Sequence, residues 1–283
     1  MTIIRFHEPY LGGNELDYLR QVIERGQFAG NGPFTVRCQT LMEQRYIVPR
    51  VLLTHSCTAA LEMTALLLDQ GPGDEVILPS YTFSTTASSF LRTGAKLVFC
   101  EVDPETMMVD VDDIAARITQ RTKAIVPVHY AGVAADLHRI LPLAKKHGIE
   151  VVEDAAQALE STLDGKPLGT FARFGCISFH ETKNLHAGLA GALYINDPAD
   201  AERATFIWER GTNRQSQLRG LVDKYTWVEL GSSFYPSELQ AAFLLAQLES
   251  IDRNRQEREI LFNAYIEQLA PMAEQGHFRL VVA

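Results

Sequence analysis

The chain has 283 residues, of which 46% are hydrophobic and 22% charged, a balance that is ordinary for a globular protein. Its formal net charge of −9 argues against general nucleic-acid binding and against adhesion to an anionic membrane surface. The four cysteines show neither CxxC nor metal-ligand spacing, and no apolar stretch reaches about 18 residues, so we expect reduced thiols, no metal site, no secretion and a cytoplasmic protein.

Short apolar runs alternate with helical patterns along the chain. Expected strands are 51–54, 75–79, 96–102, 124–129, 149–153, 175–179 and 191–196. Expected helices are 14–25, 34–46, 57–69, 83–92, 110–119, 136–147 and 198–210. Strands that alternate with helices imply crossover connections, so the fold class is α/β, with a mostly parallel, seven-stranded sheet flanked by helices.

The two ends of the chain differ from this middle part. The segment 26–33 is rich in glycine and could border a ligand. A helical pattern without internal Gly or Pro spans 237–269, and a helix of that length is expected to leave the main body. Pro271 follows it, and 278–282 looks like a strand. We therefore expect residues 1–236 to form an N-terminal segment and a large domain, and 237–283 to form a linking helix and the start of a small domain.

A lysine and an aspartate stand at the ends of two expected buried strands. Asp154 follows the strand 149–153, and Lys183 follows the strand 175–179. Lysine can form a Schiff base with an aldehyde, and aspartate can hold a protonated pyridine ring, which is what pyridoxal 5′-phosphate (PLP) requires. Each residue also has an ordinary interpretation when it is taken singly. Lys183 could be a surface lysine, and Asp154 could be the N-cap of the next helix.

Further polar and aromatic residues follow other strands. Ser56 and Thr58 begin a helix, where free N–H groups suit a phosphate, although a plain N-cap is the better interpretation of these two alone. Phe83 could stack on a cofactor ring or lie in the core. Gln157 would face the same side as Asp154 and could bond the ring hydroxyl. Together, each at a strand end, these residues predict a PLP site, and no dinucleotide, P-loop or zincin motif is present.

At this point the chain resembles the sugar-nucleotide aminotransferases, PLP-dependent enzymes of fold type I (aspartate aminotransferase-like). The likeness extends from Gly26 through Glu238. The runs that carry it are Ser56–Leu61, Gly73–Phe83, Pro127–Gly132, Glu153–Gln157 and Ser178–Asn184. The stretches Gly211–Arg214, Arg219–Gly220 and Asp223–Trp227 are most similar to the dTDP-4-amino-4,6-dideoxygalactose transaminases of enterobacterial common antigen synthesis.

The resemblance implies roles for single residues. Lys183 would be the Schiff-base lysine and proton shuttle, Asp154 would hold the pyridinium, Gln157 the ring hydroxyl, and Phe83 would stack on the ring. The phosphate would be held by Thr58, Ala59 and Ser178. The family implies a homodimer with active sites at the interface. It also implies amine transfer from L-glutamate to the 4-keto group of a dTDP-4-keto-6-deoxyhexose, a precursor of surface polysaccharide such as lipopolysaccharide.

Three departures from the family pattern leave alternatives open. Relatives carry Glu-Gly-Gly where this chain has Leu189–Gly191, and Asn and Arg where it has Ser233 and Tyr235. Relatives are also longer, so we expect the C-terminal small domain to be largely missing from this sequence. One alternative is a non-catalytic remnant that keeps the PLP-binding fold. The other is a sister PLP-dependent sugar dehydratase, against which Lys183 counts because those relatives have histidine there.

Overall fold

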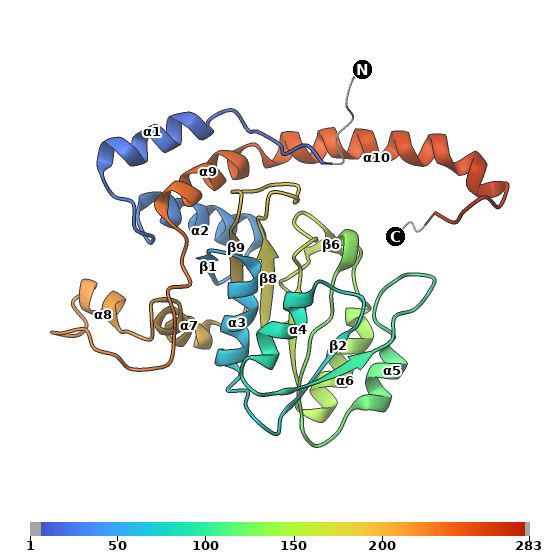
Figure 1. The fold of residues 1–283 in the computed structure, drawn as a ribbon, viewed down its shortest axis with the longest axis horizontal. Coiled ribbons are helices and arrows are strands. Elements are labelled where there is room, and N and C mark those ends of the chain that lie inside the picture. Colours follow the sequence, from blue (N-terminus) through green and yellow to red (C-terminus); the bar gives the residue numbers. More distant parts are fainter. Residues whose placement is uncertain (1–6, 281–283) are drawn as a thin grey trace.

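The computed structural model describes residues 7–280 and contains all seven expected strands in one sheet. The spatial order is β1-β9-β8-β5-β4-β2-β3 (Figure 1). The strands are β1 (Arg50–Thr54), β2 (Glu75–Pro79), β3 (Lys96–Cys100), β4 (Thr122–Ile125), β5 (Glu150–Asp154), β8 (Phe174–Ser178) and β9 (Gly191–Ile195). The predicted α/β fold class is confirmed.

Strand β9 is the antiparallel member of the sheet. It pairs antiparallel with both β1 and β8, whereas the other four pairings are parallel. The chain passes from β8 to β9 through a loop without a crossover helix, and such a return places consecutive strands antiparallel. Because β1 and β8 both oppose β9, they point in the same direction as the rest of the sheet.

A small hairpin that the sequence analysis did not anticipate follows β5. Strands β6 (Thr162–Leu163) and β7 (Lys166–Pro167) pair antiparallel around Asp164 and Gly165. The φ angles of these two residues are 51° and 76°. An Asp-Gly pair favours this left-handed turn, since glycine adopts positive φ without steric cost.

Helices cover both faces of the sheet (Figure 1). They are α1 (Glu15–Arg25), α2 (Pro33–Tyr46), α3 (Cys57–Leu67), α4 (Ser84–Leu91), α5 (Val111–Arg117), α6 (Leu137–His147), α7 (Ala201–Trp208), α8 (Arg214–Leu218), α9 (Glu238–Glu249) and α10 (Ile251–Glu274). Helices α3, α4 and α7 share one core with strand residue Leu52, and α2 and α9 share another with its neighbours Val51 and Leu53. Successive strand residues point to opposite faces, so both faces are buried, as their continuous apolar runs predict.

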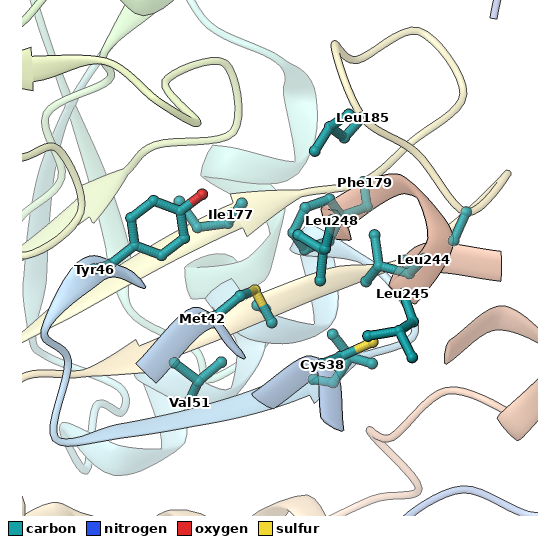
Figure 2. Packing of buried hydrophobic residues seen from close by; sticks show 14 of the residues in the cluster. Cys38, Met42, Tyr46, Val51, Ile177, Phe179, Leu185, Leu244, Leu245 and Leu248 are labelled. Carbon is teal, nitrogen blue, oxygen red and sulfur yellow. The ribbon is translucent and has the colours of Figure 1, made fainter. Parts of the chain in front are cut away.

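Figure 2 shows the core between the sheet and helices α2 and α9. Cys38 and Met42 of α2 meet Leu244 and Leu245 of α9, and all four are fully or nearly fully buried. Phe179, just beyond β8, belongs to the same cluster. The loop that carries Lys183 therefore starts from a tightly packed point, because Phe179 cannot move without opening this core.

A buried carboxylate ties α9 to the glycine-rich segment 26–33. Glu238 is 1% exposed, and it accepts hydrogen bonds from the amides of Gly32, Phe34 and Thr35 and from the Thr35 hydroxyl. These amides are the free donors at the start of α2, where the helix dipole favours a negative charge. Glu238 thus fixes the end of the segment 26–33 against the main body.

The expected single helix over 237–269 is wrong, because the structure divides it at Ser250. The Ser250 hydroxyl donates to the carbonyls of Ala246 and Gln247, an alternative to continued helical bonding. Helix α10 then runs through Pro271, which lies in its last turn and was expected beyond the helix.

The expected strand 278–282 is also not formed in its described part, since 278–280 have no regular structure and 281–282 lie outside the described residues. The division of the chain near residue 237 into two domains stays a prediction. Within residues 7–280, no helix combines the length and the apolar character needed to cross a membrane.

Candidate functional site

The carboxyl ends of six parallel strands lie at one edge of the sheet. Strands β1, β2, β3, β4, β5 and β8 all point towards this edge. The site residues named from the sequence lie at or after the ends of β1, β2, β5 and β8. Ligands of open parallel sheets bind beyond this edge, where helix N-termini and loops converge.

Asp154 is the last residue of β5 and is 3% exposed. Its Oδ2 accepts a hydrogen bond from the Thr86 hydroxyl at 2.7 Å, and its Oδ1 accepts one from the Ala156 amide at 3.1 Å. Burial raises the pKa of Asp154, although these two bonds and the positive charge of Lys183 oppose the rise. A buried carboxylate with so few partners is suited to a cation, and a protonated pyridine nitrogen would supply one.

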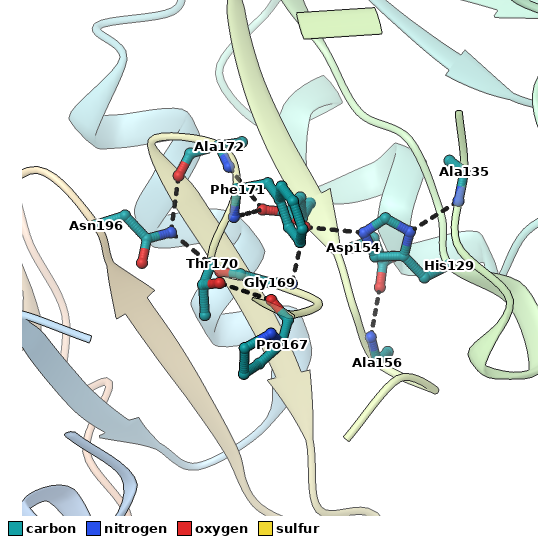
Figure 3. Close-up of polar contacts among 11 residues, drawn as sticks. His129, Ala135, Asp154, Ala156, Pro167, Gly169, Thr170, Phe171, Ala172 and Asn196 are labelled. Atoms are coloured by element: carbon teal, nitrogen blue, oxygen red, sulfur yellow. Dashed lines mark hydrogen bonds and ion pairs between the residues drawn. The ribbon is translucent and has the colours of Figure 1, made fainter. Parts of the chain in front are cut away.

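Neighbouring Glu153 joins the end of β5 to the segment 169–172, of which Figure 3 labels each residue. Its fully buried carboxylate accepts hydrogen bonds from the His129 ring and from the amides of Gly169, Phe171 and Ala172. His129 Nδ1 accepts from the Ala135 amide, so the ring proton is on Nε2 and points to Glu153. The His129 amide in turn donates to the Asp154 carbonyl, which joins the ends of β4 and β5.

Lys183 lies in a turn after β8. Its amide donates to the His180 carbonyl at 2.9 Å, and the Thr182 amide donates to His180 Nδ1 at 3.3 Å. The lysine side chain is half-buried. Lys183 shares a cavity of about 300 Å³ with Gln157 and Ser178. The other residues that line this cavity are Ala131, Ala156, Leu159, Thr182, Asn184, Leu185 and Arg258.

Gln157 is oriented by the backbone. The Ala131 amide donates to Gln157 Oε1 at 2.9 Å, and the Gln157 side-chain nitrogen donates to no acceptor among residues 7–280. A free N–H donor in the cavity fits the phenolic oxygen of the expected cofactor ring.

The start of α3 offers the expected phosphate donors. Ser56 is the N-cap and accepts a hydrogen bond from the Ala59 amide at 3.1 Å, so that amide is already engaged. The amides of Cys57 and Thr58 donate to no acceptor within residues 7–280, as is usual for a first helical turn. Cys57, which sequence reasoning did not single out, is close enough to Asp154 and Lys183 for their charges to shift its pKa; burial, the largest cause, raises it well above its usual value.

Gly191 brings β9 against this helix start. A Cβ at position 191 would come 2.4 Å from the Cys57 nitrogen and 2.5 Å from the Ser56 carbonyl carbon. Gly191 also pairs with both Thr54 and Ser178 in the sheet. The absence of a side chain here therefore lets the helix start and Ser178 approach the same space.

Phe83 is the N-cap of α4, and its side chain is 71% exposed. It is not a core aromatic, and its ring is free to stack on a ligand. The Thr86 hydroxyl, one turn later, reaches Asp154, so α4 starts beside the site. Thr86 was missed from the sequence because nothing separates it from the other hydroxyl residues of 82–89.

The residues that depart from the family pattern differ in burial: Leu189 and Ser233 are exposed, Tyr235 is partly buried and Ala190 is buried. Leu189 is 51% exposed, and its carbonyl accepts a hydrogen bond from Gln240 Nε2. The Tyr235 ring packs edge-on against Trp208 and lies under the Arg210 guanidinium, 5.4 Å from the ring centroid. Tyr235 and Arg210 line a second hollow of about 810 Å³ together with residues of the segment 26–33, whose role in ligand binding stays a prediction.

Residues 9–280 match the sequence profile of the DegT/DnrJ/EryC1/StrS aminotransferase family. Three curated relatives are each 33% identical to this chain. The spore coat polysaccharide biosynthesis protein SpsC of Bacillus subtilis matches over 91% of this chain and 67% of its own length. The dTDP-4-dehydro-2,3,6-trideoxy-D-glucose 4-aminotransferase of Saccharopolyspora spinosa matches over 90% and 69%, and the GDP-perosamine synthase of Caulobacter vibrioides over 94% and 70%.

Solved structures of aminotransferases have the same fold as this chain. The PLP form of a putative sugar aminotransferase of Streptococcus pneumoniae is 26% identical, with a TM-score of 0.88 over 95% of this chain and 72% of that one. The aminotransferase TlmJ of Streptoalloteichus hindustanus is 33% identical, with a TM-score of 0.86 over 95% and 72%. The fold predicted from the resemblance is therefore confirmed.

Proposed function

We propose that this chain, which belongs to the DegT/DnrJ/EryC1/StrS aminotransferase family, transfers an amino group to a keto group of a nucleotide-linked sugar. The cofactor is pyridoxal 5′-phosphate. The observation that carries the proposal is the arrangement at the sheet edge. A buried carboxylate, Asp154, is the last residue of β5, and a half-buried lysine, Lys183, lies in the turn after the neighbouring strand β8, beside a polar cavity.

The residues of this chain fit that cofactor. Asp154 would hold the pyridine nitrogen, Gln157 the ring hydroxyl, and Phe83 would cover one face of the ring. Thr58, Ala59 and Ser178 would surround the phosphate, with the first-turn amides of α3 as additional donors. When bound, the cofactor serves as the electron sink for breaking the bond to the α-proton of the donor.

The protein residues carry the proton and the charge. Lys183 would bond to the cofactor in the resting enzyme. Displaced by the donor amine, it would move a proton between the donor α-carbon and the cofactor as a general acid and base. Asp154 would keep the ring nitrogen protonated because its buried carboxylate gains most from a cationic partner. A sugar dehydratase is disfavoured, because such an enzyme would have histidine at the position that Lys183 occupies in this chain.

The proposal extends to the identities of the amino donor and of the sugar acceptor. We take L-glutamate as donor and the 4-keto group of a dTDP-4-keto-6-deoxyhexose as acceptor, for surface polysaccharide precursors such as those of enterobacterial common antigen. One relative is described as an enzyme of a dTDP-linked sugar and another as a GDP-perosamine synthase, so the nucleotide has to be tested directly.

We also propose a homodimer with active sites at its interface, in the cytoplasm. Exposed apolar side chains gather at the end of α8 and on the segment after it, which supports pairing with a second copy. They are Leu218, Leu221, Trp227 and Leu230.

The test is amine transfer by the PLP-loaded chain, with glutamate as donor and dTDP- or GDP-linked 4-keto-6-deoxyhexoses as acceptors. The proposal predicts transfer to the dTDP sugar in preference to the GDP sugar. Transfer to the GDP sugar alone would overturn the choice of nucleotide. Firm PLP binding without transfer to either would instead identify the chain as a non-catalytic PLP-binding protein.

A further inference from the structure

Helix α10 passes over the carboxyl edge of the sheet, at the end towards which the β8 arrow points (Figure 1). Its first turn is held by an ion pair of Asp252 with Arg45 at 2.6 Å and by a hydrogen bond from Arg253 to the Tyr10 hydroxyl at 2.9 Å. Beyond its end, Arg279 contacts Glu105 in the loop after β3. The helix is thus attached to the body on both sides of the Lys183 cavity.

One face of α10 is turned towards the body. Ile251 and Asn254 are the two residues of this helix that are buried. Arg258 follows Asn254 by four residues and Ile251 by seven, so it lies on the same face one turn further along. This placement agrees with the cavity, because Arg258 lines it together with Lys183 and Gln157.

Arg258 differs in its partners from the other arginines of α10. Arg253 and Arg255 form ion pairs with Glu257 and Glu259, at 3.9 and 3.6 Å. Arg258 forms no ion pair with any residue between 7 and 280. The residues that line the cavity include two cations, Lys183 and Arg258, and no carboxylate. A cavity of this charge attracts an anion.

We propose that Arg258 binds the carboxylate of the amino donor. The inference rests on the proposed function, in which Lys183 bonds to the cofactor and Arg258 is the cation left free at the cavity. A guanidinium matches a carboxylate with two parallel N–H donors, and such charge-assisted bonds are among the strongest polar contacts. Phosphate oxygens would also suit the same guanidinium, so the experiment separates the two substrates.

The experiment compares Arg258→Gln with Arg258→Lys and with the control Arg255→Gln, which removes a paired arginine from the same helix. In Arg258→Gln the KM for glutamate should rise by about ten- to one-hundred-fold, the scale of a lost charge-assisted bond. The KM for the nucleotide sugar and the PLP absorbance should remain within about twofold of the unchanged chain. Arg258→Lys should fall between the two, and Arg255→Gln should match the unchanged chain.

A binding measurement supplies a readout independent of turnover. Calorimetric titration of the PLP-loaded chain with succinate, an unreactive dicarboxylate, should give weaker binding in Arg258→Gln by a similar factor. If Arg258→Gln and the unchanged chain have the same Kd for succinate and the same KM for glutamate, the role of Arg258 is overturned, but the proposed function is not. A rise confined to the KM for the nucleotide sugar would assign Arg258 to phosphate instead, which also contradicts the proposal. An unchanged chain that neither binds succinate nor reacts with glutamate would overturn the proposed function as well.

Discussion

Thr86 donates a hydrogen bond to Asp154 across two elements, from helix α4 to the end of strand β5, with 2.7 Å between Thr86 Oγ1 and Asp154 Oδ2. The Thr86 hydroxyl is itself within 2.7 Å of the Thr82 hydroxyl. A hydrogen bond to a charged oxygen favours the ionised carboxylate, so Thr86 keeps the pKa of Asp154 lower than burial alone would.

Thr86→Val should therefore slow amine transfer without removing the cofactor. The isosteric change leaves Asp154 with one fewer donor and a higher pKa, which weakens its hold on the pyridinium. We expect kcat to fall by roughly tenfold, the lower end of the scale for a charged hydrogen bond. The control is Ser88→Ala, which deletes an exposed hydroxyl from the same helix. Equal turnover in Thr86→Val and Ser88→Ala would remove Thr86 from the support of Asp154.

Asp154→Asn should stabilise the cofactor-free chain at neutral pH while it slows catalysis. The pKa of Asp154 is raised by burial, so between its ordinary value, near 3.9, and the raised value the folded chain binds more protons than the unfolded one. The free energy of unfolding consequently falls as pH rises through that window. Above the raised pKa, the buried and ionised carboxylate destabilises the folded chain by a constant amount. Asparagine carries no such cost.

At pH 7 we expect Tm to rise by about 2–4 °C, which corresponds to about 1 kcal/mol for a chain of this size. Below about pH 4 the difference should vanish, because aspartate is then protonated in both states. Asp223→Asn, at an exposed position, should leave Tm unchanged. A lower Tm for Asp154→Asn at pH 7 would show that the ionised carboxylate is favourably held even without cofactor.

Gly191→Ala should disrupt both stability and cofactor binding. A Cβ at 2.4 Å from the Cys57 nitrogen forces β9 away from the start of α3. We expect a loss of roughly 2–3 kcal/mol in the free energy of unfolding, typical of overpacking at a backbone contact, together with weaker PLP binding. Gly71→Ala is the matched control, because a Cβ there meets no atom within 4 Å. Equal melting and PLP binding in the two variants would refute the close-contact role of Gly191.

The sequence predicted the parts of the site that follow from strand ends. Asp154 and Lys183 could be placed together because each follows a continuous apolar strand, and parallel strands end at one edge. Thr86 and Gly191 could not be placed, since their roles depend on how α4 and β9 approach neighbouring elements. Pattern alone does not fix such distances.

Helix boundaries show the same limit. The apolar spacing of 237–269 is continuous through Ser250, so only the local hydroxyl bonds and the change of direction reveal two helices. Without that break, the direction of α10 and the position of Arg258 at the Lys183 cavity could not be inferred.

The most direct measurement is the identity of the lysine that bonds to the cofactor. The purified chain is saturated with PLP, reduced with borohydride and digested, and the pyridoxyl-labelled peptide is mapped by mass spectrometry. The label should lie on Lys183, be absent from Lys183→Ala and persist in Lys146→Ala, an exposed lysine on α6. Label on another lysine of the unchanged chain, or none in excess PLP, would contradict the assignment of the active site to the ends of β5 and β8.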